Sequence, residues 1–472
     1  MRADSSLRLN QFAERLISVS AASTGLGIIS TWILSSYFKV DVVASHIWFG
    51  NDKWCKLPSE AIGLHCFGDF HERVAISSFG VKNWPTNLEL GPIMPFFTMF
   101  YNFLGESIGM RPMLLLVLIG YFSLLLTPLI WATKQKPLLT RVLTISTLGL
   151  SSLPFLAAMD RGNFIVISTP FLILFLIGAR RARIQMILIA VVSLAAIKPQ
   201  FLLLAVFFLV IHRYRVFVVT VLASLTLNLV LIVGAGGGDF GRIHQWLQAV
   251  LDSSSTAKLK DDFPTNISFS KGFYNFFSVV DSIVGFLFRF HENHLTANFY
   301  ESNSSLISFS LYALLVLCLI WFGTRLPIAL LSCSLIVLAC IGFGNYIPTY
   351  YLLFVISFSA IAIRSPIQVE PTTTEVSEFD HFGTQRLDRF LSSFLLWCIT
   401  WSSSCIIVPW SLSFNSGQNL GIDPSIRAVN LMSKLTPLLW FVFLVFTIIK
   451  AKRVSGSREI KNSEWAPYQI IK

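Results

Sequence analysis

Long apolar runs separated by short polar segments recur from one end of the chain to the other. The runs are continuous, whereas the strands of a membrane barrel alternate apolar and polar residues, so we predict helices. A helix needs about 20 mainly apolar residues to span a membrane, and the runs predict an all-α protein with about twelve spans, several of them short. The predicted spans lie near 16–38, 112–132, 142–158, 163–179, 184–197, 200–211, 216–234, 304–323, 326–344, 348–363, 390–411 and 433–450.

The composition excludes a soluble protein. Hydrophobic residues make up 54% of the chain and charged residues 13%, against about 25% charged residues in a soluble domain. The mean hydropathy is +0.67. The first apolar run follows Arg2, Arg8 and Arg15 and is as long as a span, so no removable signal peptide is needed.

The net charge of +11 does not indicate a nucleic-acid partner, because the basic residues are spread over short connections and form no single face. We interpret these residues as signals of membrane topology. Lysine and arginine favour cytoplasmic loops, and with an even number of spans the basic connections share the side of the N-terminus. We therefore expect a plasma-membrane protein with both termini in the cytoplasm. The basic connections contain Lys134, Lys136 and Arg141, then Arg180, Arg181 and Arg183, then Arg213 and Arg215, and finally Lys450, Lys452 and Arg453.

The opposite, extracytoplasmic side receives two long loops, 39–111 and 235–303, and a shorter one near 412–432. Within the long loops, segments 92–104 and 272–290 are too short or too mixed to span, and we predict helices that lie in the membrane interface. Loops of this size on one face are where we expect the functional site.

The predicted organisation is a transmembrane core over 1–364, a cytoplasmic linker over 365–389, a C-terminal helix pair over 390–450 and a basic tail over 451–472. The linker is polar and contains the sequence PTTTE. No phosphate-binding loop or dinucleotide motif occurs, so nothing favours ATP-driven transport. Cys55 and Cys66 share the first outer loop, and a disulfide between them is left open.

Charged residues are costly in a membrane, so those near spans are candidates for function. Three places are singled out: Asp69 in the first outer loop, the turn from Asp160 to Asn163, and Lys198-Pro199-Gln200, which breaks a long apolar stretch. Each arm of that stretch has about 13 residues, or about 20 Å, which is shorter than the hydrocarbon core of about 30 Å. Lys198 is therefore expected to be recessed, where with Arg161 it suits a phosphate group.

Plainer interpretations stand beside these. Lys198 could extend its amine to the interface, Asp160 and Arg161 could pair locally, and Asp69 could be a solvated carboxylate. The cluster of His65, Asp69, His71 and Glu72 matches no established ligand spacing, so no metal and no other cofactor is predicted.

Five segments in this order resemble the polyprenol-phosphate-mannose-dependent mannosyltransferases, a family of the GT-C superfamily of membrane glycosyltransferases. They are GDF at 68–70 followed by GPIMPFF, DRGN at 160–163, IKPQ at 197–200, NISFS from Asn266, and NYIPTYY at 345–351. The resemblance covers roughly 60–350 and implies a GT-C type core with outer catalytic loops.

The resemblance implies that Asp69 is the general base and that Lys198 and Arg161 bind the phosphate of a polyprenyl-phosphate sugar donor. A hexose, by the resemblance mannose, would pass with inversion to a lipid or glycan acceptor. Asp41 remains the alternative base. The implied substrate-binding residues are Asp160, Asn163, Gln200, Asn266, Tyr346 and Tyr350.

Two other functions remain open. A secondary transporter or flippase for a lipid-linked or anionic substrate would also have about twelve spans, but transporters usually contain paired broken helices, and the sequence shows one break, at Lys198. A non-catalytic assembly scaffold, or a polymerase or ligase of the O-antigen type, is the third possibility.

The topology can be tested by cysteine labelling. In a chain whose own cysteines are replaced, Ser77→Cys, close to Asp69, should react with a membrane-impermeant maleimide on intact cells, because the first long loop is expected outside. Lys452→Cys, in the basic tail, should react only after the membrane is opened. The reverse pattern would invert the predicted orientation.

Overall fold

The computed structural model describes residues 2–38, 91–235, 237–255, 266–288, 295–342, 347–364, 378–409 and 428–453. Asp41, Asp69 and Tyr346 lie outside the described residues, as do Cys55 and Cys66. The roles and the disulfide discussed above for these residues are therefore neither confirmed nor contradicted by the structure.

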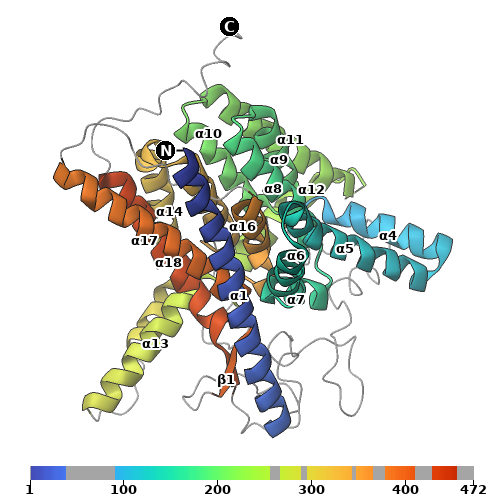
Figure 1. Ribbon diagram of the computed structural model, residues 1–472. Helices are drawn as coiled ribbons and strands as arrows, with labels where there is room; N and C mark the ends of the chain where they lie inside the picture. The colour runs from blue at the N-terminus through green and yellow to red at the C-terminus, as the bar shows by residue number, and fades with distance from the viewer. Residues whose placement is uncertain are drawn as a thin grey trace.

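Helices form nearly all of the described chain (Figure 1). The first half contains α1 (Arg2–Phe38), α4 (Met94–Ile108), α5 (Met110–Thr133), α6 (Leu138–Thr144), η3 (Ile145–Leu150), α7 (Leu153–Arg161), η4 (Phe164–Ile167), α8 (Ser168–Arg180), α9 (Ile184–Ile197), η5 (Pro199–Ala205), α10 (Val206–Val210) and α11 (Tyr214–Ala235). The second half contains α12 (Gly241–Ser255), α13 (Phe269–Phe288), α14 (Leu295–Phe322), η6 (Gly323–Arg325), α15 (Ile328–Val337), η7 (Leu338–Gly342), η8 (Thr349–Leu352), α16 (Leu353–Arg364), α17 (Glu378–Ser403) and α18 (Leu431–Arg453), with strands β1 (Ile407–Pro409) and β2 (Ala428–Asn430) between the last two helices.

Five helices in the described part are long and apolar enough to cross a membrane, and a sixth crossing results if the pair 138–150 and 153–159, bent by 55°, counts as one span. Six shorter apolar helices, of 10–17 residues, fill the other predicted positions. The expectation of a helical, membrane-embedded protein is confirmed in this coarser form. The predicted helices of the outer loops are also present, as α4 and α13.

The outer surface of the helices is apolar. Leu222 and Val230 on α11 are 58% and 62% exposed, and Trp321 on α14 is 77% exposed. A soluble protein rarely exposes continuous apolar surface of this kind. These faces are therefore suited to contact lipid.

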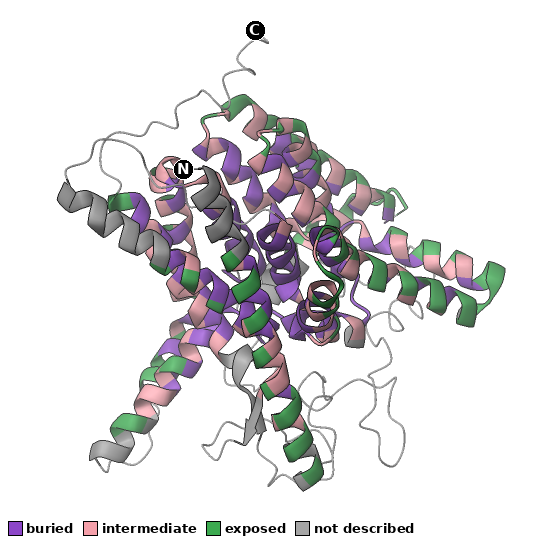
Figure 2. Ribbon diagram, in the orientation of Figure 1, coloured by how far each residue is buried: buried purple, intermediate pink, exposed green. Residues whose placement is uncertain are grey.

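The core is centred on α16, in which every residue from Leu353 to Ile363 is buried. This helix packs against both α5 and α8. Trp440 of α18 closes the core from another side, because its ring contacts Phe354 and Phe358 and its indole N–H donates to the Ser402 hydroxyl at 2.8 Å. Figure 2 shows buried residues in the middle of the bundle and exposed residues on the projecting α4–α5 pair.

Two predicted boundaries in the C-terminal third are corrected. The linker predicted over 365–389 is shorter, because α17 begins at Glu378. No proline interrupts the chain from there to Ser403, and adding a residue to an existing helix is easier than starting one. The span predicted over 390–411 ends at Ser403, and β1 then pairs with β2 in antiparallel register, with Ile407 opposite Asn430.

The break at Lys198 is confirmed. Helix α9 ends at Ile197, Lys198 is extended with φ −149° and ψ 123°, and the tighter 3-10 turn η5 follows. Proline at 199 explains this geometry, because the residue before a proline disfavours the helical conformation. A residue of the segment 39–111, expected to form the first outer loop, bonds next to the break, since the Ile93 N–H donates to the Ala196 carbonyl at 3.2 Å.

Gly91→Ala is expected to destabilise the protein, because a Cβ atom at Gly91 would lie 2.0 Å from the Ile197 carbonyl oxygen. Overpacking of this kind costs about 1–3 kcal/mol. The temperature at which half of the protein in detergent is no longer monodisperse should therefore fall by a few degrees. Gly120→Ala is the matched control, because a Cβ there meets nothing within 4 Å; an equal loss in both variants would contradict the close approach at Gly91.

Candidate functional site

The DRGN segment forms a hydrogen-bonded turn between α7 and η4. Gly162 ends α7 in the left-handed conformation, with φ 60° and ψ 34°, and its N–H donates to the Ala158 carbonyl at 3.0 Å. Glycine adopts this conformation without the usual steric penalty. The buried Asn163 then caps the next turn by accepting the Ile165 N–H at 3.0 Å. For Asp160 and Arg161 only the backbone is described.

Helix α4 of the first outer loop lies on this turn. The rings of Phe97 and Tyr101 stack on Phe164 with centroid distances of 6.4 and 5.7 Å. Burial raises the pKa of the Tyr101 hydroxyl, so this group stays protonated and neutral. Because Ile93, just before α4, bonds to Ala196, the segment 93–108 joins the DRGN turn to the Lys198 break.

Gln200, after the break, holds two irregular segments together. Its side-chain amide donates to the Ala339 carbonyl at 2.8 Å. Ala339 belongs to η7, a wider π-helical turn, and such turns are frequent at functional sites. Gln200 therefore has a structural contact that leaves its predicted role in substrate binding untested.

The segment 235–303, expected to form the second outer loop, joins the site through Asn266. Its side-chain carbonyl accepts the Ser268 N–H at 3.0 Å and the Ile347 N–H at 3.1 Å. The Ile267 N–H donates to the Ile347 carbonyl at 2.8 Å, and a bridge pairs Asn266 with Pro348. The short helix η8 follows and packs against α7.

Of the segments singled out in the sequence, those that the structure describes are thus linked in space, whereas GDF at 68–70 lies outside the described residues. Lys198 and Tyr350 are half-buried, and the Tyr350 ring stacks on Tyr351 at 5.5 Å. The side-chain oxygens of Asn163 and Asn266 bond to backbone N–H groups. Asn163 therefore stabilises the start of η4, and Asn266 holds the segment 266–268 against Ile347.

Lys271 is a candidate site residue that was not predicted from the sequence. Lys271, at the start of α13, is 1% exposed, and its amine lies 5.0 Å from the centre of the Tyr274 ring. Its backbone N–H donates to the Ser268 hydroxyl at 3.1 Å, next to the Asn266 bridge. A buried charge is unfavourable without compensation. Its position inside the aromatic run FSKGFYNFF was the available signal.

The described residues contain no group of three or more His, Cys, Asp and Glu side chains placed to hold a metal. What they bring together is the amide of Gln200 next to the Lys198 break and, at the Asn266 junction, the amide of Asn266 with the buried Lys271 close by. Comparison with known proteins finds no matching protein family, no matching curated protein and no matching solved structure.

Asn266→Ala should destabilise the junction between the segment 266–268 and Ile347–Pro348, because two N–H groups lose their acceptor and each unsatisfied buried group costs about 1–3 kcal/mol. Thermal unfolding in detergent measures the loss. Asn266→Asp keeps an acceptor oxygen and should recover most of the stability. Equal loss in both variants would show that the acceptor is not what holds the junction.

Proposed function

We propose that the protein is a membrane glycosyltransferase that transfers a hexose, by the resemblance mannose, from a polyprenyl-phosphate donor to a lipid or glycan acceptor. In this proposal the shorter apolar helices also enter the membrane, which gives about twelve crossings and a GT-C type core. The reaction takes place on the extracytoplasmic face.

The observation that carries the proposal is the break at Lys198 and what surrounds it. A lysine interrupts the apolar bundle between α9 and η5, and one residue of each long loop, Ile93 and Asn266, bonds to the core, Ile93 beside this break and Asn266 just before η8. A recessed cation that the membrane can reach suits the phosphate of a lipid carrier. The exposed apolar helices suit its polyprenyl chain.

The chemistry assigned to the site is a direct displacement. The acceptor hydroxyl oxygen forms a bond to the anomeric carbon while the bond from that carbon to the phosphate oxygen breaks. The acceptor proton passes to Asp69, and the electron pair leaves with the polyprenyl phosphate. Lys198 and Arg161 stabilise the charge that grows on the departing phosphate. One displacement inverts the configuration at the anomeric carbon.

A transporter or flippase is the second candidate, and one observation favours it. The pair 138–150 and 153–159 is bent by 55°, which adds a second discontinuity to the one at Lys198. Transporters commonly place two discontinuous helices around their substrate. Vesicle uptake of solutes, or lipid translocation without sugar transfer, would support this candidate over the enzyme.

Membranes containing the protein should transfer sugar from a labelled polyprenyl-phosphate mannose to one of a panel of lipid and glycan acceptors. Asp69→Asn should lower the rate by about 100-fold to 10,000-fold, which is the usual contribution of a general base. Lys198→Gln should lower kcat by about 100-fold to 1,000-fold through loss of charge stabilisation.

Lys452→Gln is the control, because this exposed lysine lies in the last turn of α18 and has no place in the proposed site. It should retain the wild-type rate. Full transfer by Asp69→Asn would remove Asp69 as the base and direct the search to Asp41. Full transfer by Lys198→Gln would remove the proposed phosphate contact.

A further inference from the structure

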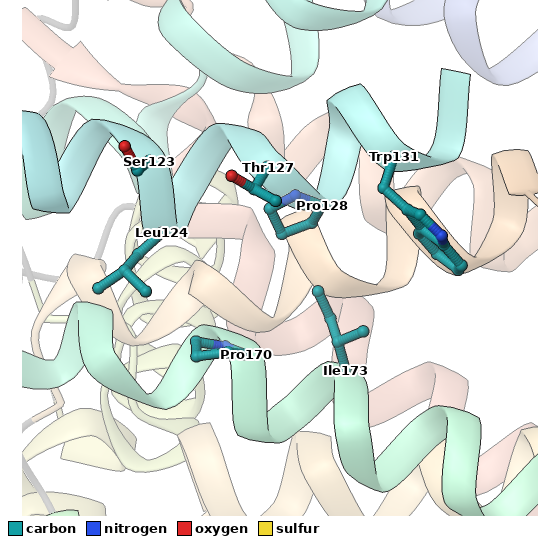
Figure 3. Close-up of a pocket in the computed structure, with 7 residues that line it drawn as sticks. All are labelled: Ser123, Leu124, Thr127, Pro128, Trp131, Pro170 and Ile173. Atoms are coloured by element: carbon teal, nitrogen blue, oxygen red, sulfur yellow. The ribbon is translucent and has the colours of Figure 1, made fainter. Parts of the chain in front are cut away.

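A groove of about 300 Å³ lies between α5 and α8, away from the Lys198 break. Figure 3 shows α5 and α8 side by side along it. Its lining is almost entirely apolar, and it includes three residues that are exposed to the surroundings, Ser123, Thr127 and Pro170. The lining residues are Ser123, Leu124, Thr127, Pro128, Trp131, Pro170 and Ile173.

The sequence of α5 explains the groove. Pro128 lies inside the helix, where its ring removes one backbone hydrogen bond and disturbs the preceding turn. The wall there also presents the small side chains of Ser123 and Thr127, which leave space between α5 and α8 at these two positions. An apolar groove that opens toward lipid is filled by hydrocarbon, because water gains no polar partners in it.

The length of the groove matches one leaflet. From Ser123 to Trp131 the helix rises about 12 Å, close to half of a hydrocarbon core of about 30 Å. The groove ends at Trp131, two residues before the end of α5. Tryptophan favours this depth, where its ring meets the headgroups.

The end of the groove at Trp131 carries positive charge. The guanidinium of Arg364, the last residue of α16, lies 5.5 Å from the centre of the Trp131 ring and donates to the Gln135 side chain at 3.1 Å. Arginine has five donors, so this bond leaves others to reach phosphate oxygens. Lys134 beside Gln135 is exposed, and the segment 131–141 contains no acidic residue.

We propose that this groove binds an anionic phospholipid of the leaflet on the basic side of the membrane. One acyl chain lies along α5 and α8, and the headgroup phosphate meets Arg364 and Lys134. The same face carries the basic connections that the sequence places in the cytoplasm, so this lipid is distinct from a donor held at Lys198. The site does not depend on the proposed sugar transfer.

The test is native mass spectrometry of the purified protein in detergent containing equal amounts of phosphatidylglycerol and phosphatidylcholine with the same acyl chains. The wild type should retain phosphatidylglycerol about five-fold more than phosphatidylcholine, the gain expected from one cation at the membrane surface. Arg364→Gln should bring the ratio close to one. Thr127→Phe fills the groove and should reduce retention of both lipids.

Two matched controls separate the groove from a general effect. Arg325→Gln removes an arginine that lies in the same way over a ring, 5.6 Å from the centre of Phe322, and Leu222→Phe enlarges an exposed residue on α11. Both should behave as the wild type. Equal retention of the two lipids by the wild type, or equal losses in Arg325→Gln and Arg364→Gln, would overturn the proposal, and so would unchanged retention in Thr127→Phe.

Discussion

A backbone group that leaves a helix inside an apolar protein needs another hydrogen-bond partner, and this constraint organises the whole site. Where α9 stops at Ile197, the Ala196 carbonyl accepts from Ile93 of the first outer loop. The Ala339 carbonyl, in a widened turn, accepts from Gln200. The Ile347 N–H donates to the side-chain carbonyl of Asn266, in the segment expected to form the second outer loop. Each irregular segment is therefore held by a residue from a distant part of the chain.

The same constraint connects the fold with the proposed chemistry. A protein whose outer surface is apolar exposes few polar groups, and those it keeps near its helix breaks are the ones that a polar ligand can meet. Lys198 and Tyr350 are half-buried at such breaks, while Lys271 is buried beside the Asn266 junction. A lipid-phosphate substrate fits this arrangement, since its chain favours the membrane and its phosphate favours the cations.

The helices were predictable from the sequence because hydropathy and turn residues act locally. The interruption Lys198-Pro199-Gln200 predicted the break, and the short connection from Asp160 to Asn163 between two apolar runs predicted the turn. The contacts between segments were not predictable, because Gln200 and Ala339 are 139 residues apart and no periodic pattern marks either. The early start of α17 at Glu378 was missed for another reason, since its polar composition conceals an uninterrupted helix. Hydropathy also gave no sign that Lys271 is buried.

The most direct test of the central claim is an experimental structure of the protein in a lipid nanodisc with a polyprenyl-phosphate sugar bound. Our account predicts that a phosphate oxygen lies within about 4 Å of the Lys198 amine, the usual limit for an ion pair, and that the polyprenyl chain runs along apolar helices. A phosphate bound elsewhere, with the Lys198 amine turned away from it toward bulk water, would contradict the account.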